Sequence, residues 1–316
     1  MHYDAFTAND GTRLAFQTSL SLINPSSPKP HLPYTRCILL LHGFSGSSTY
    51  FIRNTPTLST HHWVVAPDLR GHGRSGHSAG GYHVARLAMD LHEFLEYLRI
   101  ATDTPNIEFI PVGCSIGAAV LWTYIELFGA STPFTGMVFV DQAPLQDRSP
   151  FFGWHEGRAH TGCYDEATMM NAQSAWIEQP AAAARGLVAE CLGYRFMPRE
   201  EDPVGAEQRS VDEEFFVEIS GLCDGQWLAR LIADHTRYDH REALELITVP
   251  IVVMLGKQSG CFTREGMLET ASRVRGVKGM EDKVVVSEFK GGHWLFYEEA
   301  DRFNRELLEF VDSLEP

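Results

Sequence analysis

The chain is short of positive charge. Its 316 residues include 26 lysines and arginines against 41 aspartates and glutamates, which gives a formal net charge of −15. An acidic surface repels nucleic-acid phosphates and anionic lipid headgroups. We therefore expect no nucleic acid and no membrane surface among the partners of this protein, and look instead for a small-molecule substrate.

Long hydrophobic runs are also missing. No apolar stretch approaches the roughly 18 residues that a membrane-spanning helix needs, and residues 1–16 lack the cationic segment and apolar run of a secretory signal peptide. The six cysteines form no Cys-x-x-Cys pair, and several lie in apolar runs, which favours reduced, buried thiols. We expect a cytoplasmic protein.

Signatures of bound cofactors are absent as well. The histidines are scattered, and pairs such as His61-His62 and Asp234-His235 lack a third metal ligand at a recognisable spacing. No glycine-rich dinucleotide fingerprint follows the first buried run. We therefore expect neither a metal nor a cofactor.

What remains is an alternation of strand-like and helix-like segments. Residues 1–18 alternate apolar and polar side chains around Asn9-Asp10-Gly11, which is typical of a β-hairpin. The proline- and serine-rich residues 21–35 predict a surface loop. Continuous apolar runs that indicate buried parallel strands start near residues 37, 63, 107, 136, 251 and 283. Helical spacing is found at residues 83–100, 118–129 and 299–314. Together they predict an α/β fold, with helices on both faces of a mostly parallel sheet.

One long segment breaks this alternation. Helical patterns occupy residues 164–179, 181–193, 211–222 and 224–236, and the polar residues 196–210 predict a loop between them. We expect a core formed by residues 1–144 and 247–316, with residues 145–246 inserted as a helical cap.

Three glycine-flanked motifs carry the chemistry. Gly113-Cys114-Ser115-Ile116-Gly117 lies between a predicted strand and a predicted helix, where a tight, strained turn exposes the serine hydroxyl. His42-Gly43-Phe44-Ser45 follows the first parallel strand, so the backbone N–H groups of Phe44 and Ile116 are candidate donors of an oxyanion hole. Gly291-Gly292-His293-Trp294 follows the last strand and makes His293 a candidate base.

The order of the motifs HGFSGS, APDLRGHGRSG, GCSIG and GGH resembles the α/β-hydrolase superfamily. It is similar in particular to small esterase-like members with a helical cap between the sixth and seventh strands. The resemblance implies a triad with Ser115 as nucleophile, His293 as base and a carboxylate partner. The loop from Asp68 to Gly76 is structural in that family, so neither Asp68 nor His72 is expected to be catalytic.

The carboxylate is displaced from its usual place. In most of the superfamily it follows the seventh strand in a G-x-x-D pattern, where this chain has Gly256-Lys257-Gln258-Ser259. A serine hydroxyl can orient an imidazole but cannot offset its positive charge. Glu265 is one replacement, although it also fits the first turn of a helix capped by Thr263. Asp141 directly follows the sixth strand, where some members place the acid, and is our prediction.

The cap is rich in aromatic side chains, which favours an apolar pocket. Residues expected to line the pocket are Phe44, Phe151, Phe152, Trp154 and Trp294, with His155, Arg158 and His160 as candidates to contact a polar group. The predicted function is hydrolysis of a carboxylic ester or lactone through an acyl-enzyme. Two alternatives stay open: a cofactor-independent oxygenase or other non-hydrolytic lyase that uses the His/Asp pair, and a hydrolase-derived ligand receptor.

Overall fold

The computed structural model describes residues 1–22, 34–129, 133–196 and 205–314. Its centre is one eight-stranded sheet with the order β1-β2-β4-β3-β5-β6-β7-β8. The strands are β1 (His2–Thr7), β2 (Arg13–Thr18), β3 (Arg36–Leu41), β4 (Trp63–Pro67), β5 (Glu108–Cys114), β6 (Met137–Val140), β7 (Ile251–Gly256) and β8 (Val284–Phe289). The first two form the predicted hairpin, β2 runs antiparallel to β4, and all other neighbours are parallel. The predicted α/β architecture is confirmed.

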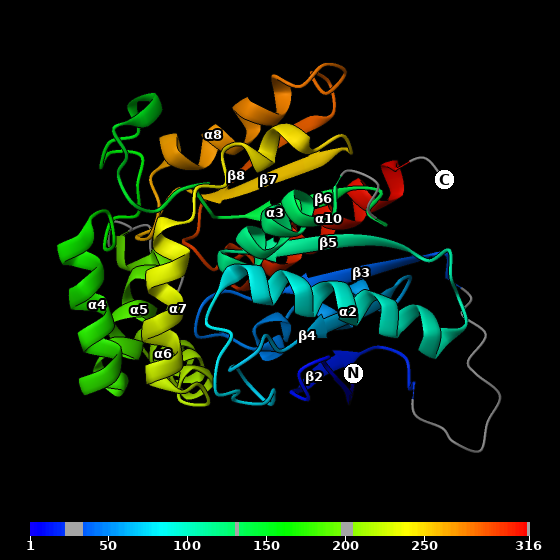
Figure 1. Cartoon of the computed structure of the whole chain (residues 1–316), viewed down its shortest axis with the longest axis horizontal. Helices are drawn as coiled ribbons and strands as arrows, with labels where there is room; N and C mark the ends of the chain where they lie inside the picture. Colours follow the sequence, from blue (N-terminus) through cyan, green and yellow to red (C-terminus); the bar gives the residue numbers. More distant parts are fainter. Residues whose placement is uncertain (23–33, 130–132, 197–204, 315–316) are drawn as a thin grey trace.

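Helices cover both faces of the sheet, as Figure 1 shows. Along β3, Leu39 and Leu41 pack into one apolar cluster with α2 (Val84–Thr102) and α3 (Ile116–Phe128). Ile38 and Leu40 point to the other face and pack with α10 (Ala300–Ser313). A strand buried on both faces has no polar side to present, which explains why its sequence reads as a continuous apolar run. The remaining core helices are α1 (Thr55–Leu58), α8 (Arg264–Arg275) and α9 (Leu295–Glu298).

A helical insert separates β6 from β7. It comprises α4 (Glu166–Glu178), α5 (Pro180–Cys191), α6 (Ala206–Ser220) and α7 (Gly225–Arg237), which gather at one end of the molecule in Figure 1. Helix α6 starts earlier than predicted, because residues 206–209 are good helix formers that follow Gly205, so the predicted loop is wrong there. Most of the predicted loop at 21–35 lies outside the described residues.

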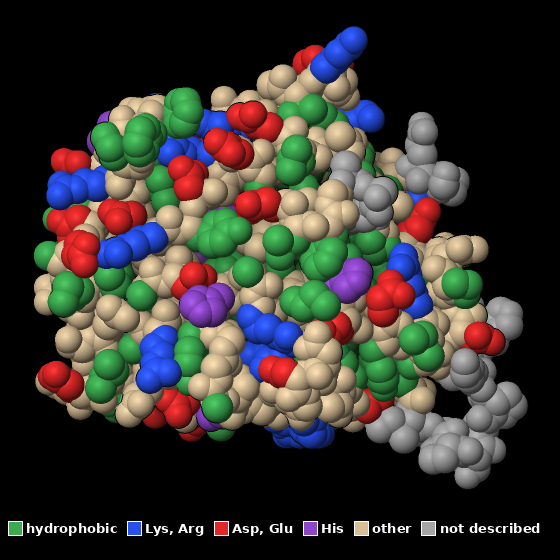
Figure 2. Space-filling model, in the orientation of Figure 1, with side chains coloured by type: hydrophobic (Ala, Val, Ile, Leu, Met, Phe, Trp, Pro, Cys, Tyr) green, Lys and Arg blue, Asp and Glu red, His purple; other side chains and the backbone are tan. Residues whose placement is uncertain are grey.

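The surface is mixed in charge. Figure 2 shows acidic and basic side chains interspersed over one face, so the excess negative charge is not concentrated in a single patch there. Within the described ranges, none of the helices has both the length and the apolar character required to cross a bilayer.

Candidate active site

Ser115 occupies a strained turn between β5 and α3. Its backbone has φ 53° and ψ −124°, a combination that residues other than glycine rarely adopt. Only glycines fit beside it: a Cβ on Gly117 would lie 2.6 Å from the carbonyl oxygen of Leu41, and one on Gly113 would lie 2.6 Å from the nitrogen of Ala118. This turn puts the serine at the carboxyl end of β5 and at the first turn of α3.

Asp141 follows β6 and is also strained and buried, with φ 47° and 1% exposure. Its Oδ1 atom lies 2.6 Å from Nδ1 of His293. The same oxygen accepts a hydrogen bond of 2.7 Å from the Ser259 hydroxyl, and Oδ2 accepts one of 2.7 Å from the Gly256 N–H. The carboxylate is therefore held by donors on both oxygens and can orient the imidazole.

The other candidate acid is far from this arrangement. Glu265 lies in the first turn of α8, where the Thr263 hydroxyl accepts a hydrogen bond of 3.1 Å from the Gly266 N–H and caps the helix. The exposed Glu265 carboxylate forms an ion pair of 2.8 Å with Arg158. The structure thus brings Asp141, and not Glu265, to His293.

The surroundings of His293 favour its positive form. Burial lowers the pKa of this imidazole, but the electrostatic influence of the nearby Cys261 and the hydrogen bond to Asp141 outweigh that effect and raise the pKa to about 9. The loop that carries His293 is tied to the insert by Glu298, whose carboxylate accepts hydrogen bonds of 3.1 Å from the N–H groups of Gly193 and Gly292. Burial raises the pKa of Glu298 to about 7.

Backbone N–H groups lie beside the serine. The turn after β3 approaches it closely, because a Cβ on Gly43 would lie 3.2 Å from Cβ of Ser115. Phe44 follows in that turn, and Ile116 opens α3, where the first N–H groups have no partner within the helix. His42 helps to hold the turn in place, because its Nε2 atom accepts a hydrogen bond of 2.9 Å from the Leu69 N–H. Burial lowers the pKa of the His42 imidazole to about 4.

The family-typical loop after β4 is held together from within. Asp68 accepts hydrogen bonds from the N–H groups of Ser48 at 2.6 Å and Arg74 at 2.8 Å. His72 is buried and its Nδ1 atom lies 2.8 Å from the carbonyl oxygen of Arg70. These contacts join backbone segments of the core, which agrees with the structural role expected of this loop.

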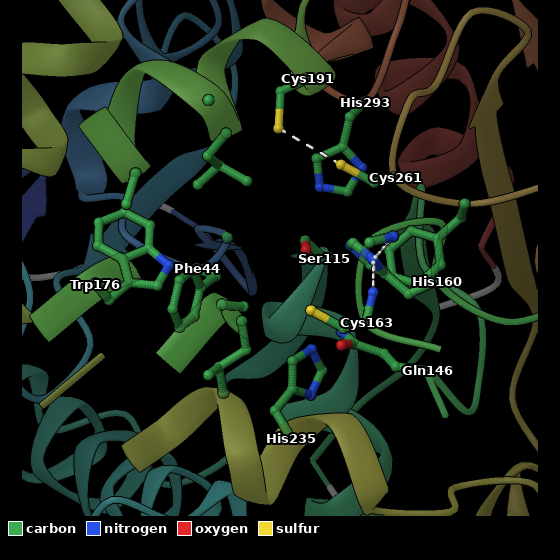
Figure 3. Close-up of a pocket in the computed structure, with 18 of the residues that line it drawn as sticks. Phe44, Ser115, Gln146, His160, Cys163, Trp176, Cys191, His235, Cys261 and His293 are labelled. Carbon is green, nitrogen blue, oxygen red and sulfur yellow. Dashed lines mark hydrogen bonds between the residues drawn. The ribbon is translucent and has the colours of Figure 1, made fainter. Parts of the chain in front are cut away.

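Ser115 and His293 line one cavity of about 250 Å³ between the strand ends and the helical insert (Figure 3). Phe44 and Trp176 form part of an apolar wall, with their ring centroids 5.5 Å apart. Other apolar lining residues include Ala183, Leu187, Ile232, Phe262 and Trp294. Polar and sulfur-bearing lining residues are Gln146, His160, His235, Cys163, Cys191 and Cys261.

The structure places only some of the residues predicted to line the pocket at this cavity. Phe44, Trp294 and the alternative residue His160 line the cavity, whereas its described lining does not include Phe151, Phe152 or Trp154. The loop after β6 turns outward, so Phe151 and Phe152 are 70% and 76% exposed. Trp154 is buried in the core instead, with the Arg241 guanidinium 5.4 Å from its ring. Phe151, Phe152 and Trp154 follow β6 in the sequence, but this position alone does not direct their side chains into the cavity.

Several cavity residues escaped the sequence analysis. His235 lies on α7 and is 3% exposed, and neither ring nitrogen has a hydrogen-bond partner within the described residues. Burial holds the pKa of His235 well below its usual value, so the ring is neutral. Its spacing from Trp227 and Leu231 would have placed it on the buried face of that helix. No local pattern pointed to Cys191 and Cys261, whose sulfurs lie 3.7 Å apart.

Comparison with known sequences identifies the family of this chain. The sequence profile of the alpha/beta hydrolase family matches residues 38–306, and the chain belongs to that family. Among curated proteins it is 25% identical over 276 residues to the dihydrolipoyllysine-residue acetyltransferase component of the acetoin cleaving system of Pseudomonas putida. That match covers 87% of this chain, which spans only 63% of the length of the relative.

Solved structures with the same fold include three enzymes of low sequence identity. An esterase from Exiguobacterium antarcticum is 17% identical, with a TM-score of 0.77 over 98% of this chain and 99% of its own. A bromoperoxidase from Bacillus anthracis is 19% identical, with a TM-score of 0.76 over 98% and 100% of the two chains. An enol-lactonase from Burkholderia xenovorans is 17% identical, with a TM-score of 0.71 over 98% and 100%. At this identity the likeness establishes the fold alone.

Proposed function

We propose that this protein is a serine hydrolase that cleaves a carboxylic ester or lactone of a small, largely apolar molecule. The observation that carries the proposal is the 2.6 Å contact between Nδ1 of His293 and the Asp141 carboxylate, at a cavity that Ser115 also lines. A contact through Nδ1 leaves Nε2 of the imidazole available for a serine hydroxyl, as nucleophilic catalysis requires.

In the proposed mechanism, Ser115 Oγ attacks the carbonyl carbon while Nε2 of His293 removes the hydroxyl proton. Asp141 orients the resulting imidazolium and stabilises its charge. The N–H groups of Phe44 and Ile116 donate to the oxyanion, and the positive end of the α3 dipole adds to this stabilisation. His293 then protonates the leaving oxygen, which gives an acyl-enzyme and an alcohol. His293 then removes a proton from water, which attacks the acyl carbon; the carboxylic acid leaves as Ser115 Oγ takes the proton back from His293.

The cavity supports a small substrate. Its volume of about 250 Å³ is below the range of about 300–1,000 Å³ that is usual for ligand pockets. The wall that contains Phe44 and Trp176 favours an apolar acyl or alkyl group, and the neutral His235 can donate to, or accept from, one polar group of the substrate. Esterases and lactonases among the structural neighbours are consistent with either an open or a cyclic ester.

The test is a panel of short, long and aryl p-nitrophenyl esters and several lactones, assayed with the wild type and Ser115→Ala. Loss of a serine nucleophile from a triad lowers kcat by up to about 10⁶-fold, so turnover is expected to fall to the small residual rate, about 10³–10⁴-fold above the free substrate, that an oxyanion hole and binding alone can give. Ser272→Ala, at an exposed position of α8, serves as the matched control and should keep the wild-type rate. Turnover close to the wild-type rate in Ser115→Ala would refute the acyl-enzyme and favour chemistry by the His/Asp pair alone.

A further inference from the structure

Three buried side chains from separate elements converge on one wall of the cavity. Cys191 ends α5, Cys261 lies between β7 and α8, and His293 follows β8. One potential ligand atom from each lies within 4.8 Å of the other two, and the residues are 1%, 2% and 4% exposed. Figure 3 shows the two sulfurs facing each other beside the imidazole ring. All three residues line the cavity.

The spacing of the sulfurs matches the edge of a metal tetrahedron. The two Sγ atoms are 3.7 Å apart, whereas a disulfide would require about 2.05 Å. Two thiolates bound to one tetrahedral Zn²⁺ at about 2.3 Å lie about 3.8 Å from each other. The cysteines can therefore bind one ion between them with little rearrangement.

The histidine has one ring nitrogen left for the same ion. Its Nδ1 atom is committed to Asp141 at 2.6 Å, which leaves Nε2 as the ligand atom. A carboxylate on the far nitrogen is the usual second partner of a zinc-binding histidine, since it fixes the tautomer and the ring orientation. Two thiolates and one neutral imidazole also cancel the charge of a divalent cation, so the buried complex is neutral.

We propose that Cys191 Sγ, Cys261 Sγ and His293 Nε2 form a Zn²⁺ site in the wall of the catalytic cavity. Soft thiolates together with imidazole select zinc over magnesium or calcium. On binding, each thiol that is still protonated releases its proton to solvent, and the fourth position of the tetrahedron stays open for water.

The consequence is reversible inhibition, and this part rests on the proposed function. An Nε2 atom that is bound to zinc has no lone pair left to accept the proton of Ser115. Zinc therefore removes the general base without blocking the whole cavity, and a chelator restores it. The site would link ester hydrolysis to the availability of free zinc.

The site itself is tested without any enzyme assay. The full chain is freed of metal, reduced, and titrated with Co²⁺ under anaerobic conditions. We expect one equivalent to produce thiolate-to-cobalt charge-transfer absorption and the visible bands of tetrahedral cobalt, and one equivalent of Zn²⁺ to remove them.

Variants of the two cysteines test which side chains bind the metal. Losing a residue that only hydrogen-bonds a metal ligand typically weakens metal binding by roughly 10–100-fold, and Cys191→Ser and Cys261→Ser should each weaken it by more than that. Cys223→Ser, at a half-buried cysteine outside the described cavity lining, should bind like the wild type. Missing charge-transfer absorption, or bands that persist in both Cys191→Ser and Cys261→Ser, would overturn the site.

Inhibition is measured separately, as the ratio of p-nitrophenyl ester hydrolysis with and without buffered Zn²⁺ within each variant. The wild type and Cys223→Ser should lose activity with zinc and regain it with chelator, whereas the remaining activity of Cys191→Ser should resist zinc. Zinc that binds but leaves the rate unchanged, or raises it, would refute the inhibitory role. If the metal-free wild type hydrolyses no ester, the proposed function is contradicted but the metal site is not. The cobalt spectrum tests the site independently of any hydrolysis.

Discussion

Asp141 and Ser259 are joined by a hydrogen bond of 2.7 Å from the serine hydroxyl to the carboxylate oxygen that contacts His293. Ser259 stands where most of the superfamily carries its acid. The carboxylate that contacts His293 thus follows the neighbouring strand β6 and also contacts the side chain at the usual acid position. Ser259 serves as a donor that helps to hold Asp141 in place.

Replacing Asp141 with asparagine should abolish most of the activity. Asparagine keeps the shape but has no charge to stabilise the imidazolium, and its amide can favour the wrong tautomer of His293. The comparable change in a serine protease lowers kcat by about 10⁴-fold, and we expect a loss of about 10³–10⁴-fold in kcat for p-nitrophenyl ester hydrolysis. Glu265→Gln is the control and should keep nearly the full rate, because Glu265 pairs with Arg158 at the surface. The opposite pattern would assign the acid to Glu265.

Moving the carboxylate back to position 259 should rescue part of that loss. In the double variant Asp141→Asn/Ser259→Asp, the new carboxylate replaces the Ser259 hydroxyl, which lies 2.7 Å from the Asp141 carboxylate in the wild type. We expect kcat to rise at least about 10-fold above Asp141→Asn alone, because a charge close to the imidazole is restored. Asp141→Asn/Ser259→Ala introduces no charge and should show no rescue. Equal rates in the two double variants would mean that a carboxylate at 259 cannot reach His293.

The pH dependence of hydrolysis should report the pKa of His293. The base is active only when neutral, so a pKa raised from 6.5 to about 9 moves the rising limb of kcat/KM to alkaline pH. Cys261→Ser removes a negative neighbour, so the pKa of His293 should fall and the limb should shift by about 1 pH unit or more toward lower pH. Cys223→Ser should leave the limb where it is. An unshifted limb in Cys261→Ser would show that Cys261 carries no charge in the free enzyme.

The fold was predictable because its signals are local. Each buried strand appears as a continuous apolar run, and the Gly-x-Ser-x-Gly turn has its strand and helix as immediate neighbours. Asp141 could be chosen as a candidate from the sequence since it directly follows a strand, and the structure places its carboxylate 2.6 Å from His293. The orientation of Phe151 and Phe152 was not predictable, because it depends on the distant Arg241, whose guanidinium donates to the Phe151 carbonyl oxygen and lies 5.3 Å from the Phe152 ring.

Contacts between segments far apart in the chain, such as that between Cys191 and Cys261, could not be predicted from the sequence. Cys191 and Cys261 are separated by 70 positions and meet only because α5 ends above the loop that follows β7. Neither cysteine has a second ligand nearby in the chain, so spacing rules for metal sites did not detect them. Such a site is a property of the packed insert and core together.

The last prediction concerns the turn that carries Ser115. In Gly117→Ala the added methyl would lie 2.6 Å from the backbone oxygen of Leu41, which cannot move without disturbing β3. Overpacking of this kind costs about 1–3 kcal/mol, and we expect the free energy of unfolding in urea to fall by that amount. Gly186→Ala is the matched control on α5, where a Cβ meets no atom within 4 Å. There the higher helix propensity of alanine should raise stability by about 0.5–1 kcal/mol. If the two variants were equally stable, the tight approach of α3 to β3 would not be what requires glycine after the serine.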